Sequence, residues 1–391
     1  MNPFEFGEKF RIEVSGSSHG PSVGVRIGGC PAGIEVNESD IQLQLDHRKP
    51  GQSLLTTQRV EEDKVVIESG IENGATTGGE ISMHVKNKNV IAAHYSSMQN
   101  TPRPGHADFP AKVKYGPTDL SGGGFFSGRM TAAFVMAGAV AKKIIGKSGI
   151  ETMAFARQIG SVSVQRDVSE SEIRQNTYSN PVHTAAAESV EKMVTEVESA
   201  RRDGDSVGGV IECRILGVPA GRGEPMFRSI ESVVSQAMFA IPAVKGMEFG
   251  SGFAGSTLRG SQNNDGYALE DGKVVTTTNN CGGILGGLST GMPIIFRVAI
   301  KPTSSIYTPQ HTVDLQTMKP AMLSIKGRHD PCIAIRAVPV VENLAAVCIA
   351  DMMLLEDEGK KRLGERNGNE DRERMQEKWE KRADERNWKG A

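Results

Sequence analysis

DLSGGGFFSGRMTAAF, from Asp119 to Phe134, joins a glycine-rich segment to the start of an apolar one. The apolar segment continues from Met130 to Ile145 and carries alanine, glycine and aliphatic residues around most of its circumference. This pattern predicts a buried helix rather than a surface helix. The small side chains at positions such as Ala137 and Gly138 predict that neighbouring elements pack closely against it.

The glycine-rich segment before this helix is not a P-loop. It lacks the Gly-Lys-Ser/Thr ending that grips a β-phosphate and a magnesium ion. Gly122–Gly124 nevertheless allow the backbone to come close to a ligand, and Ser127 and Arg129 precede the start of the helix. Because helix N-termini favour anions, the segment is a candidate for binding a negatively charged ligand.

Strands and helices are predicted on both sides of this helix. Val- and Ile-rich runs bounded by Gly, Pro or Asn predict strands at Val23–Ile27, Lys64–Glu68, Ile81–Val85, Gly209–Leu216 and Ile294–Ile300. Further helical patterns cover Glu38–Leu45, Ile230–Phe239 and Val340–Leu355. The two kinds of element do not alternate as they do in a doubly wound parallel sheet. The sequence therefore predicts a single layered domain of the α+β class over residues 1–355.

Residues 356–391 differ in composition from the rest of the chain. They are dense in charges of both signs and almost free of aliphatic residues. Such a segment cannot bury much surface, so we expect a solvated helix or a disordered tail.

Composition excludes several classes of protein. The 391 residues carry a net charge of −2, so there is no global basic field of the kind that drives nucleic-acid binding. The five cysteines are far apart and form no CxxC pair, which argues against a zinc site and a disulfide framework. No signal-peptide core and no run of transmembrane length are apparent. We expect a cytoplasmic protein with no metal, membrane or nucleic-acid partner.

The segment RPGHAD, residues 103–108, is the clearest chemical motif taken alone. Pro104 and Gly105 favour a turn that projects Arg103 and His106 into one cleft. An arginine can bind an anionic leaving group while a histidine donates a proton. The alternative is a surface pair of Arg103 and Asp108 that merely fixes a loop.

Together, the polar segments resemble the chorismate synthase family. They are GSSHG (16–20), HRKPG (47–51), RPGHAD (103–108), FFSGRMT (125–131), VKGMEFGSGF (244–253), NNCGGILGGLSTGMP (279–293), KPTSSI (301–306) and GRHDPC (327–332). They occur in the family's order, and the likeness runs from about Phe10 to Leu355. It implies a β-α-β sandwich and, as is typical of the family, a homotetramer.

The resemblance also implies a reaction. The family converts 5-enolpyruvylshikimate 3-phosphate to chorismate and phosphate by an anti-1,4-elimination that needs reduced FMN without net redox change. Such a substrate carries one phosphate and two carboxylates, so a site rich in arginine is expected even in a chain of net charge −2.

The resemblance assigns roles residue by residue. The implied catalytic residues are His19, His106, Asp330 and Ser127, with the two histidines as proton donors. The implied substrate-binding residues are Arg48, Arg103, Arg129 and Arg328. The implied flavin-binding residues are Phe125, Phe126, Ser127, Pro242, Ala243, Gly286, Lys301, Pro302, Thr303, Ser304, Ser305 and Arg328.

Several positions depart from the family pattern. The family usually has Arg at Phe125, Ser at Phe126, Ala at Gly128, Glu at Met130, an acid at Ser17 and an Arg near Leu54. Two interpretations follow, an active FMN-dependent enzyme or a related protein that binds flavin or an anion without turnover. An ordinary flavin oxidoreductase would need a nicotinamide site, and no fingerprint supports one. The missing arginine near Leu54 also argues against reduction of the flavin by the protein's own use of NADPH.

Overall fold

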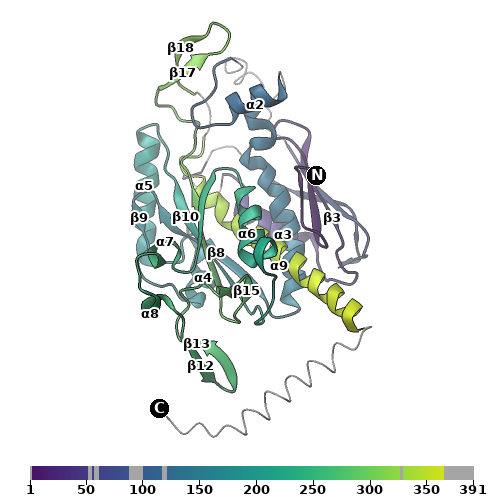
Figure 1. Cartoon of the computed structure of the whole chain (residues 1–391). Coiled ribbons are helices and arrows are strands. Elements are labelled where there is room, and N and C mark those ends of the chain that lie inside the picture. The colour runs from purple at the N-terminus through teal and green to yellow at the C-terminus, as the bar shows by residue number, and fades with distance from the viewer. Residues whose placement is uncertain are drawn as a thin grey trace.

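Two five-stranded antiparallel sheets enclose a central layer of helices (Figure 1). The structure is a computed structural model that describes residues 2–51, 55–56, 61–87, 100–116, 121–325 and 329–364. The expected layered α+β fold, with helices between sheets, is confirmed.

The first sheet has the order β1-β2-β3-β7-β4. Its strands are β1 (Glu5–Phe6), β2 (Arg11–Gly16), β3 (Ser22–Gly28), β4 (Val65–Ser69) and β7 (Ile81–Lys86). Alternate residues of β7 face the interior, so Ile81, Met83 and Val85 are fully buried. This apolar face packs on the central helices, which leaves the other face to the solvent.

The second sheet has the order β11-β16-β10-β8-β9. Its strands are β8 (Glu151–Ile159), β9 (Val162–Ser163), β10 (Gly209–Leu216), β11 (Val244–Phe249) and β16 (Ile294–Ile300). Along β16 the residues Ile294, Phe296, Val298 and Ile300 are buried and alternate with more exposed ones. Like the first sheet, it presents one apolar face to the helical layer.

The helical layer is built around α3 (Thr131–Gly146) and α9 (Ala334–Gly364), which pack side by side. Helix α1 (Glu38–Arg48) and helix α6 (Ile230–Phe239) flank them. The two central helices approach closely at Gly138, where an added Cβ would lie 2.3 Å from the Cβ of Asn343. The predicted buried helix with small residues is therefore confirmed as the centre of the fold.

Helix α9 continues through Pro339, although proline ordinarily interrupts a helix. Proline at this position removes the N–H that would bind the carbonyl of Ile335. Instead, Nδ1 of His183 lies 3.0 Å from that carbonyl oxygen. Burial lowers the pKa of His183 to about 4, so the ring is neutral near pH 7 and Nδ1 can carry the donated proton. The buried histidine thus satisfies the backbone group that the proline leaves unpaired.

The same helix corrects one sequence-based expectation. By length and composition alone, Ala334–Glu358 could cross a membrane, whereas no segment of that length was expected. However, 78% of its most apolar window is buried inside the fold, which is the behaviour of a core helix. The predicted boundary at residue 355 also falls inside this helix, where Glu356 accepts hydrogen bonds from the Arg222 side chain and the Gly223 backbone N–H.

Further hairpins and helices lie outside the two large sheets and the central helices. Four hairpins pair β5 (Ile71–Glu72) with β6 (Ala75–Thr76), β12 (Tyr267–Glu270) with β13 (Lys273–Thr276), β14 (Ile284–Leu285) with β15 (Leu288–Ser289), and β17 (Gln310–Asp314) with β18 (Lys319–Leu323). The short helices are α2 (Asp108–Tyr115), α4 (Glu170–Asn176), α5 (Val190–Arg202), α7 (Gly252–Gly255) and α8 (Gly260–Asn263). The β12–β13 and β17–β18 hairpins project from opposite ends of the molecule (Figure 1).

Candidate active site

A cavity of about 750 Å³ opens where α3 and α9 begin. Its walls come from the end of α1, the RPGHAD turn, the glycine-rich segment, and the loops before β11 and after β16. Predicted site residues that line it are Arg48, Arg103, His106, Phe125, Phe126, Ser127, Arg129, Pro242, Ala243, Lys301, Pro302, Thr303, Ser304, Ser305 and Asp330. Segments far apart in the sequence therefore meet in one space.

The RPGHAD turn brings Arg103, His106 and Asp108 together at this cavity. Arg103 donates to both carboxylate oxygens of Asp108, over 2.7 Å from Nε and 2.8 Å from Nη2. Nδ1 of His106 lies 2.6 Å from Asp108 Oδ1. Both the expected turn and the alternative Arg103–Asp108 ion pair are therefore present. The ion pair is not a surface pair, because Arg103 lines the cavity and is only 9% exposed.

The charge of Asp108 is maintained by these two neighbours. Burial alone would raise the pKa of this carboxyl group, but hydrogen bonds from Arg103 and His106 outweigh it and hold the pKa well below its ordinary value. Asp108 is therefore ionised at neutral pH. A permanent carboxylate beside Nδ1 fixes the orientation of the His106 ring and favours a proton on that nitrogen.

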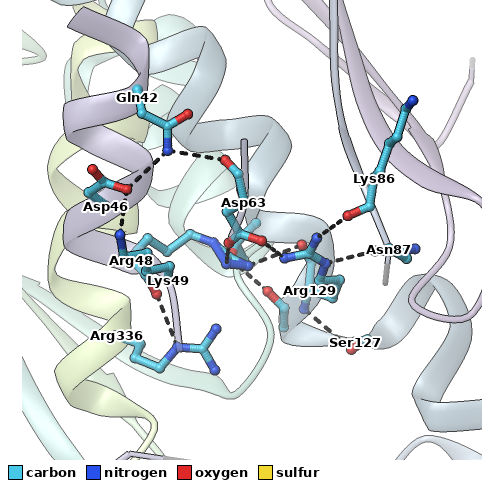
Figure 2. A network of polar contacts seen from close by, with 12 residues as sticks. Gln42, Asp46, Arg48, Lys49, Asp63, Lys86, Asn87, Ser127, Arg129 and Arg336 are labelled. Atoms are coloured by element: carbon cyan, nitrogen blue, oxygen red, sulfur yellow. Dashed lines mark hydrogen bonds and ion pairs between the residues drawn. The ribbon is translucent and has the colours of Figure 1, made fainter. Parts of the chain in front are cut away.

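Arg48 and Arg129 meet at one buried carboxylate, that of Asp63 (Figure 2). Arg48 Nη1 lies 3.3 Å from Asp63 Oδ2, and Arg129 Nη1 donates to Asp63 Oδ1. Arg129 also donates from Nε to Asn87 Oδ1 over 2.9 Å and from Nη2 to the Lys86 carbonyl over 3.3 Å. Every nitrogen of the Arg129 guanidinium group is therefore already bound to a protein oxygen.

Asp330 is held at the start of α9. Its Oδ2 accepts a hydrogen bond of 2.7 Å from Nη1 of Arg336, whose Nε donates to the Arg48 carbonyl over 3.1 Å. This arrangement places Arg336 between two predicted site residues on the cavity wall.

The KPTSSI segment supplies a polar wall with two lysines near it. Lys301 Nζ donates to Ser304 Oγ and to the Gly105 carbonyl, each over 2.6 Å. Burial, and then the positive charge of Lys245, lower the pKa of Lys301. Thr303 Oγ1 is buried without a hydrogen-bond partner in the structure. An unpaired hydroxyl on the lining of a cavity that also holds Lys245 and Lys301 suits an incoming anion.

Phe125 and Phe126 belong to a small aromatic cluster at the cavity. Their ring centroids are 4.6 Å apart, and Phe125 also packs edge-on against Tyr115 at 5.5 Å and Phe4 at 5.7 Å. These contacts show how the two aromatic residues are accommodated where the family usually has arginine and serine.

Two predicted site residues that the structure describes, His19 and Gly286, do not line the cavity. His19 does not line the cavity; its Nδ1 lies 3.1 Å from Ser18 Oγ, while the Ser18 backbone N–H binds the Gly124 carbonyl of the glycine-rich segment. Gly286 lies in the turn between β14 and β15, also outside this lining. Arg328 lies outside the described residues, as does Leu54.

The sequence interpretation missed Asp63, Lys245 and Arg336. Asp63 sits in the acidic run EED, which reads as a solvated surface, and no pattern marked it as buried. Arg336 could have been found, because it is the only charge in the apolar run CIAIRAVPVV and an isolated charge there needs a partner.

The cavity combines guanidinium, ammonium, imidazole and hydroxyl groups with an aromatic and aliphatic wall. A concave space with a few convergent polar groups on an apolar wall is typical of a small-molecule site, so the protein is of the enzyme class. Within the described residues, no group of three or more His, Cys, Asp or Glu side chains could hold a metal ion.

Comparisons with known proteins name the family. The chorismate synthase family model matches residues 10–354. A chorismate synthase of Korarchaeum cryptofilum is 49% identical over 89% of this chain and 97% of its own, and one of Methanocella arvoryzae is 50% identical over 89% and 94%. A crystal structure of chorismate synthase superposes with a TM-score of 0.73 at 27% identity, covering 92% of this chain and 97% of that one. The chain belongs to the chorismate synthase family, so the resemblance seen in the sequence is confirmed.

Proposed function

We propose that this protein is a working chorismate synthase, a lyase that eliminates phosphate from 5-enolpyruvylshikimate 3-phosphate with reduced FMN. The observation that carries the proposal is the cavity that combines Arg48, Arg103 and Lys301 with His106. In the elimination a C–H bond and the C–O bond to phosphate break at opposite ends of an allylic system. The hydrogen leaves as a proton, its electron pair enters the shifted double bonds, and phosphate leaves with the electron pair of the C–O bond.

Arginine side chains recognise the substrate in this proposal. A guanidinium group presents a planar fork of donors that matches a carboxylate or a phosphate, so several arginines suit a substrate with three anionic groups. Arg103 donates to Ser305 Oγ over 3.2 Å as well as to Asp108, which fixes its plane against the cavity. Partial burial excludes water and strengthens the attraction to an anion.

His106 is the proton donor of the described cavity. Asp108 binds Nδ1, and Nη2 of Arg103 lies 3.2 Å from Nε2, so an anion bound by Arg103 would lie beside the nitrogen that exchanges a proton with it. A Cβ on Gly123 would lie 3.5 Å from Nε2, so the glycine-rich segment runs close to this atom. His19 remains the second proposed donor, and Ser127 and Asp330 remain proposed for the region around the flavin.

The cavity residues fit a bound FMN. The partnerless hydroxyl of Thr303 and the lysine pair Lys245 and Lys301 suit the phosphate, while the loop from Phe239 to Val244 and the rings of Phe125 and Phe126 suit an apolar ring system. Bound reduced FMN supplies electron density to the breaking C–O bond without net oxidation or reduction. Gly286 and Arg328 remain proposed as further flavin contacts.

The proposal is tested by an anaerobic assay of chorismate formation with dithionite-reduced FMN. Chorismate and phosphate should appear in equal amounts, and omission of either FMN or dithionite should abolish both. Binding of oxidised FMN and substrate without any product under reducing conditions would instead support a protein that binds without turnover.

Family membership supports a proposal for the quaternary structure and the cellular setting. We propose a homotetramer in the cytoplasm that takes a small-molecule substrate and acts in aromatic amino-acid biosynthesis. We also propose that the flavin is reduced by another system rather than by NADPH on this chain. Size-exclusion chromatography with light scattering tests the tetramer, and an assay in which NADPH replaces dithionite tests the source of electrons.

A further inference from the structure

We propose that Asp63 is a positioning residue that holds Arg48 and Arg129 in the orientation needed to bind the substrate, an inference that rests on the proposed function. Asp63 precedes β4 and is 2% exposed. It does not line the cavity, whereas Arg48 and Arg129 do. Any effect of Asp63 on the substrate must therefore pass through the two arginines.

The carboxylate is shared so that each oxygen serves one arginine. Oδ2 faces Arg48 and Oδ1 faces Arg129, as Figure 2 shows. The two arginines also contact each other directly, because Arg48 Nη2 lies 3.4 Å from the carbonyl oxygen of Arg129. The side chains of Arg48 and Arg129 are 1% and 6% exposed, so neither has water as a substitute partner.

The position of Asp63 is itself fixed from α1. Gln42 Nε2 donates to the Asp63 carbonyl over 3.3 Å (Figure 2). Gln42 Oε1 accepts from the Val65 backbone N–H over 3.1 Å. The Asp63 backbone has φ 46°, in the left-handed region that Asp and Asn tolerate better than most residues. A carboxylate anchored in this way has little freedom to follow a moving arginine.

Arg48 retains the donors that a ligand could use. Its two contacts through Nη1 and Nη2 are long, and its Nε is buried without a hydrogen-bond partner in the structure. Arg129, in contrast, already uses three of its five N–H donors in bonds to protein oxygens, one from each nitrogen. We therefore infer that Arg48 keeps more donors for the anion, and that Asp63 and Arg129 together hold it in place.

The two possible roles of Asp63, a simple counterion or a positioning residue, predict opposite effects on anion binding when its charge is removed. If Asp63 only balances charge, Asp63→Asn removes one negative charge and should leave anion binding equal or tighter. If Asp63 positions Arg48, the result differs. The NH2 group of the asparagine side chain would face the guanidinium group of either Arg48 or Arg129, and two donors cannot bond each other. Arg48 would then lose the contacts that set its orientation. Asparagine also suits a positive φ, so this substitution preserves the backbone.

The experiment measures the dissociation constant of 5-enolpyruvylshikimate 3-phosphate with oxidised FMN present, and kcat and KM in the anaerobic assay. We expect Asp63→Asn to weaken binding by about tenfold and to lower kcat/KM by up to about 100-fold, the cost of a small misplacement. Asp40→Asn is the matched control, because Asp40 also lies on α1, accepts hydrogen bonds from Lys143 and the Asn37 backbone N–H, and does not line the cavity. It should leave these constants unchanged.

A double-mutant cycle with Arg48→Lys tests whether Asp63 affects substrate binding through Arg48. If Asp63 acts through Arg48, then Asp63→Asn should cost less than about threefold in binding once Arg48 is replaced. A full additive loss, or unchanged or tighter binding by Asp63→Asn alone, would overturn the proposal. Binding of inorganic phosphate to the parent and to Asp63→Asn gives the same comparison even if the parent forms no chorismate.

A second variant covers a failure of Asp63→Asn to fold. Asp63→Glu keeps the charge but moves it by one methylene, so the positioning role predicts weakened binding while a pure charge role predicts none. If neither variant folds, Asp63 is a structural counterion and the positioning role is wrong.

Discussion

Replacing Gly138 with alanine tests the packing that sets the whole sandwich. An added Cβ would lie 2.3 Å from the Cβ of Asn343 and 2.5 Å from its backbone oxygen. Ordinary contacts between carbon atoms are about 3.5–4.0 Å, so α3 and α9 would have to separate by roughly 1 Å at this point. The backbone oxygen cannot be moved by a change of rotamer, so the strain must be carried by the helices.

The free energy of unfolding can be estimated from two opposing effects. Overpacking a core typically costs about 1–3 kcal/mol, and a clash with backbone belongs at the upper end. Alanine in a helix interior returns about 1 kcal/mol relative to glycine. We therefore expect Gly138→Ala to destabilise the protein by about 2 kcal/mol, and to lower the melting temperature by about 3 °C.

Gly146→Ala on the same helix is the matched control. It makes the same chemical change at the last residue of α3, where an added Cβ would meet nothing within 4 Å. Its melting temperature should equal or slightly exceed that of the parent. Thermal unfolding followed by fluorescence or circular dichroism measures all three proteins, and a Gly138→Ala protein at least as stable as the parent would refute the reasoning.

Gly138→Ala should also lower the activity of the enzyme. The cavity is lined by Thr131 at the start of α3 and by Arg336 near the start of α9. A shift of about 1 Å between these helices can cost up to about 100-fold in kcat/KM. That loss should be visible well below the melting temperature, whereas Gly146→Ala should retain parental kinetics.

Three further predictions concern the site and the tail. His106→Ala should reduce turnover by about two to four orders of magnitude with little change in FMN affinity, and parental turnover would disprove a role as proton donor. Phe125→Arg with Phe126→Ser should weaken substrate binding measured with oxidised FMN, because it removes packed aromatic surface; tighter binding, by about 1–3 kcal/mol, would mark the native segment as a damaged anion site. Truncation after Glu356 keeps that residue's contact with Arg222 and should leave melting temperature and activity nearly unchanged, so loss of folded protein would show that the tail packs on the body or on another subunit.

Elements with a strong apolar pattern and clear boundaries could be predicted from the sequence. The strands Gly209–Leu216 and Ile294–Ile300 and the helix Ile230–Phe239 have the predicted bounds. The nine-residue strand β8 was missed, because its sequence ETMAFARQI has no β-branched run in its core. Its burial between β10 and β9 is a tertiary effect that local preference does not show.

The start of α9 was placed six residues too late for a different reason. Proline at position 339 argues against a helix there, and only the distant His183 supplies the partner that lets the helix continue. A contact across that distance in the chain cannot be read from local sequence.

In the candidate site too, local sequence patterns could be predicted and tertiary contacts could not. Motifs with unusual local composition, such as RPGHAD and KPTSSI, indicated residues that do meet in one cavity. Asp63 was not indicated, because its importance comes from burial beside two arginines rather than from any local pattern. Family resemblance supplied the reaction and the cofactor, neither of which follows from spacing or charge.

The place of α9 in the chain has a consequence for biosynthesis. This helix fills the space between the two sheets and contacts α1, α3, α6, β8 and β10, yet it begins only at residue 334. During translation, strands β8 and β10 and helix α3 leave the ribosome before the helix that packs on them exists. These apolar faces therefore stay uncovered until α9 is made, and the exposure of the nascent polypeptide to aggregation, with its demand for chaperones, lasts until after residue 334 has been added.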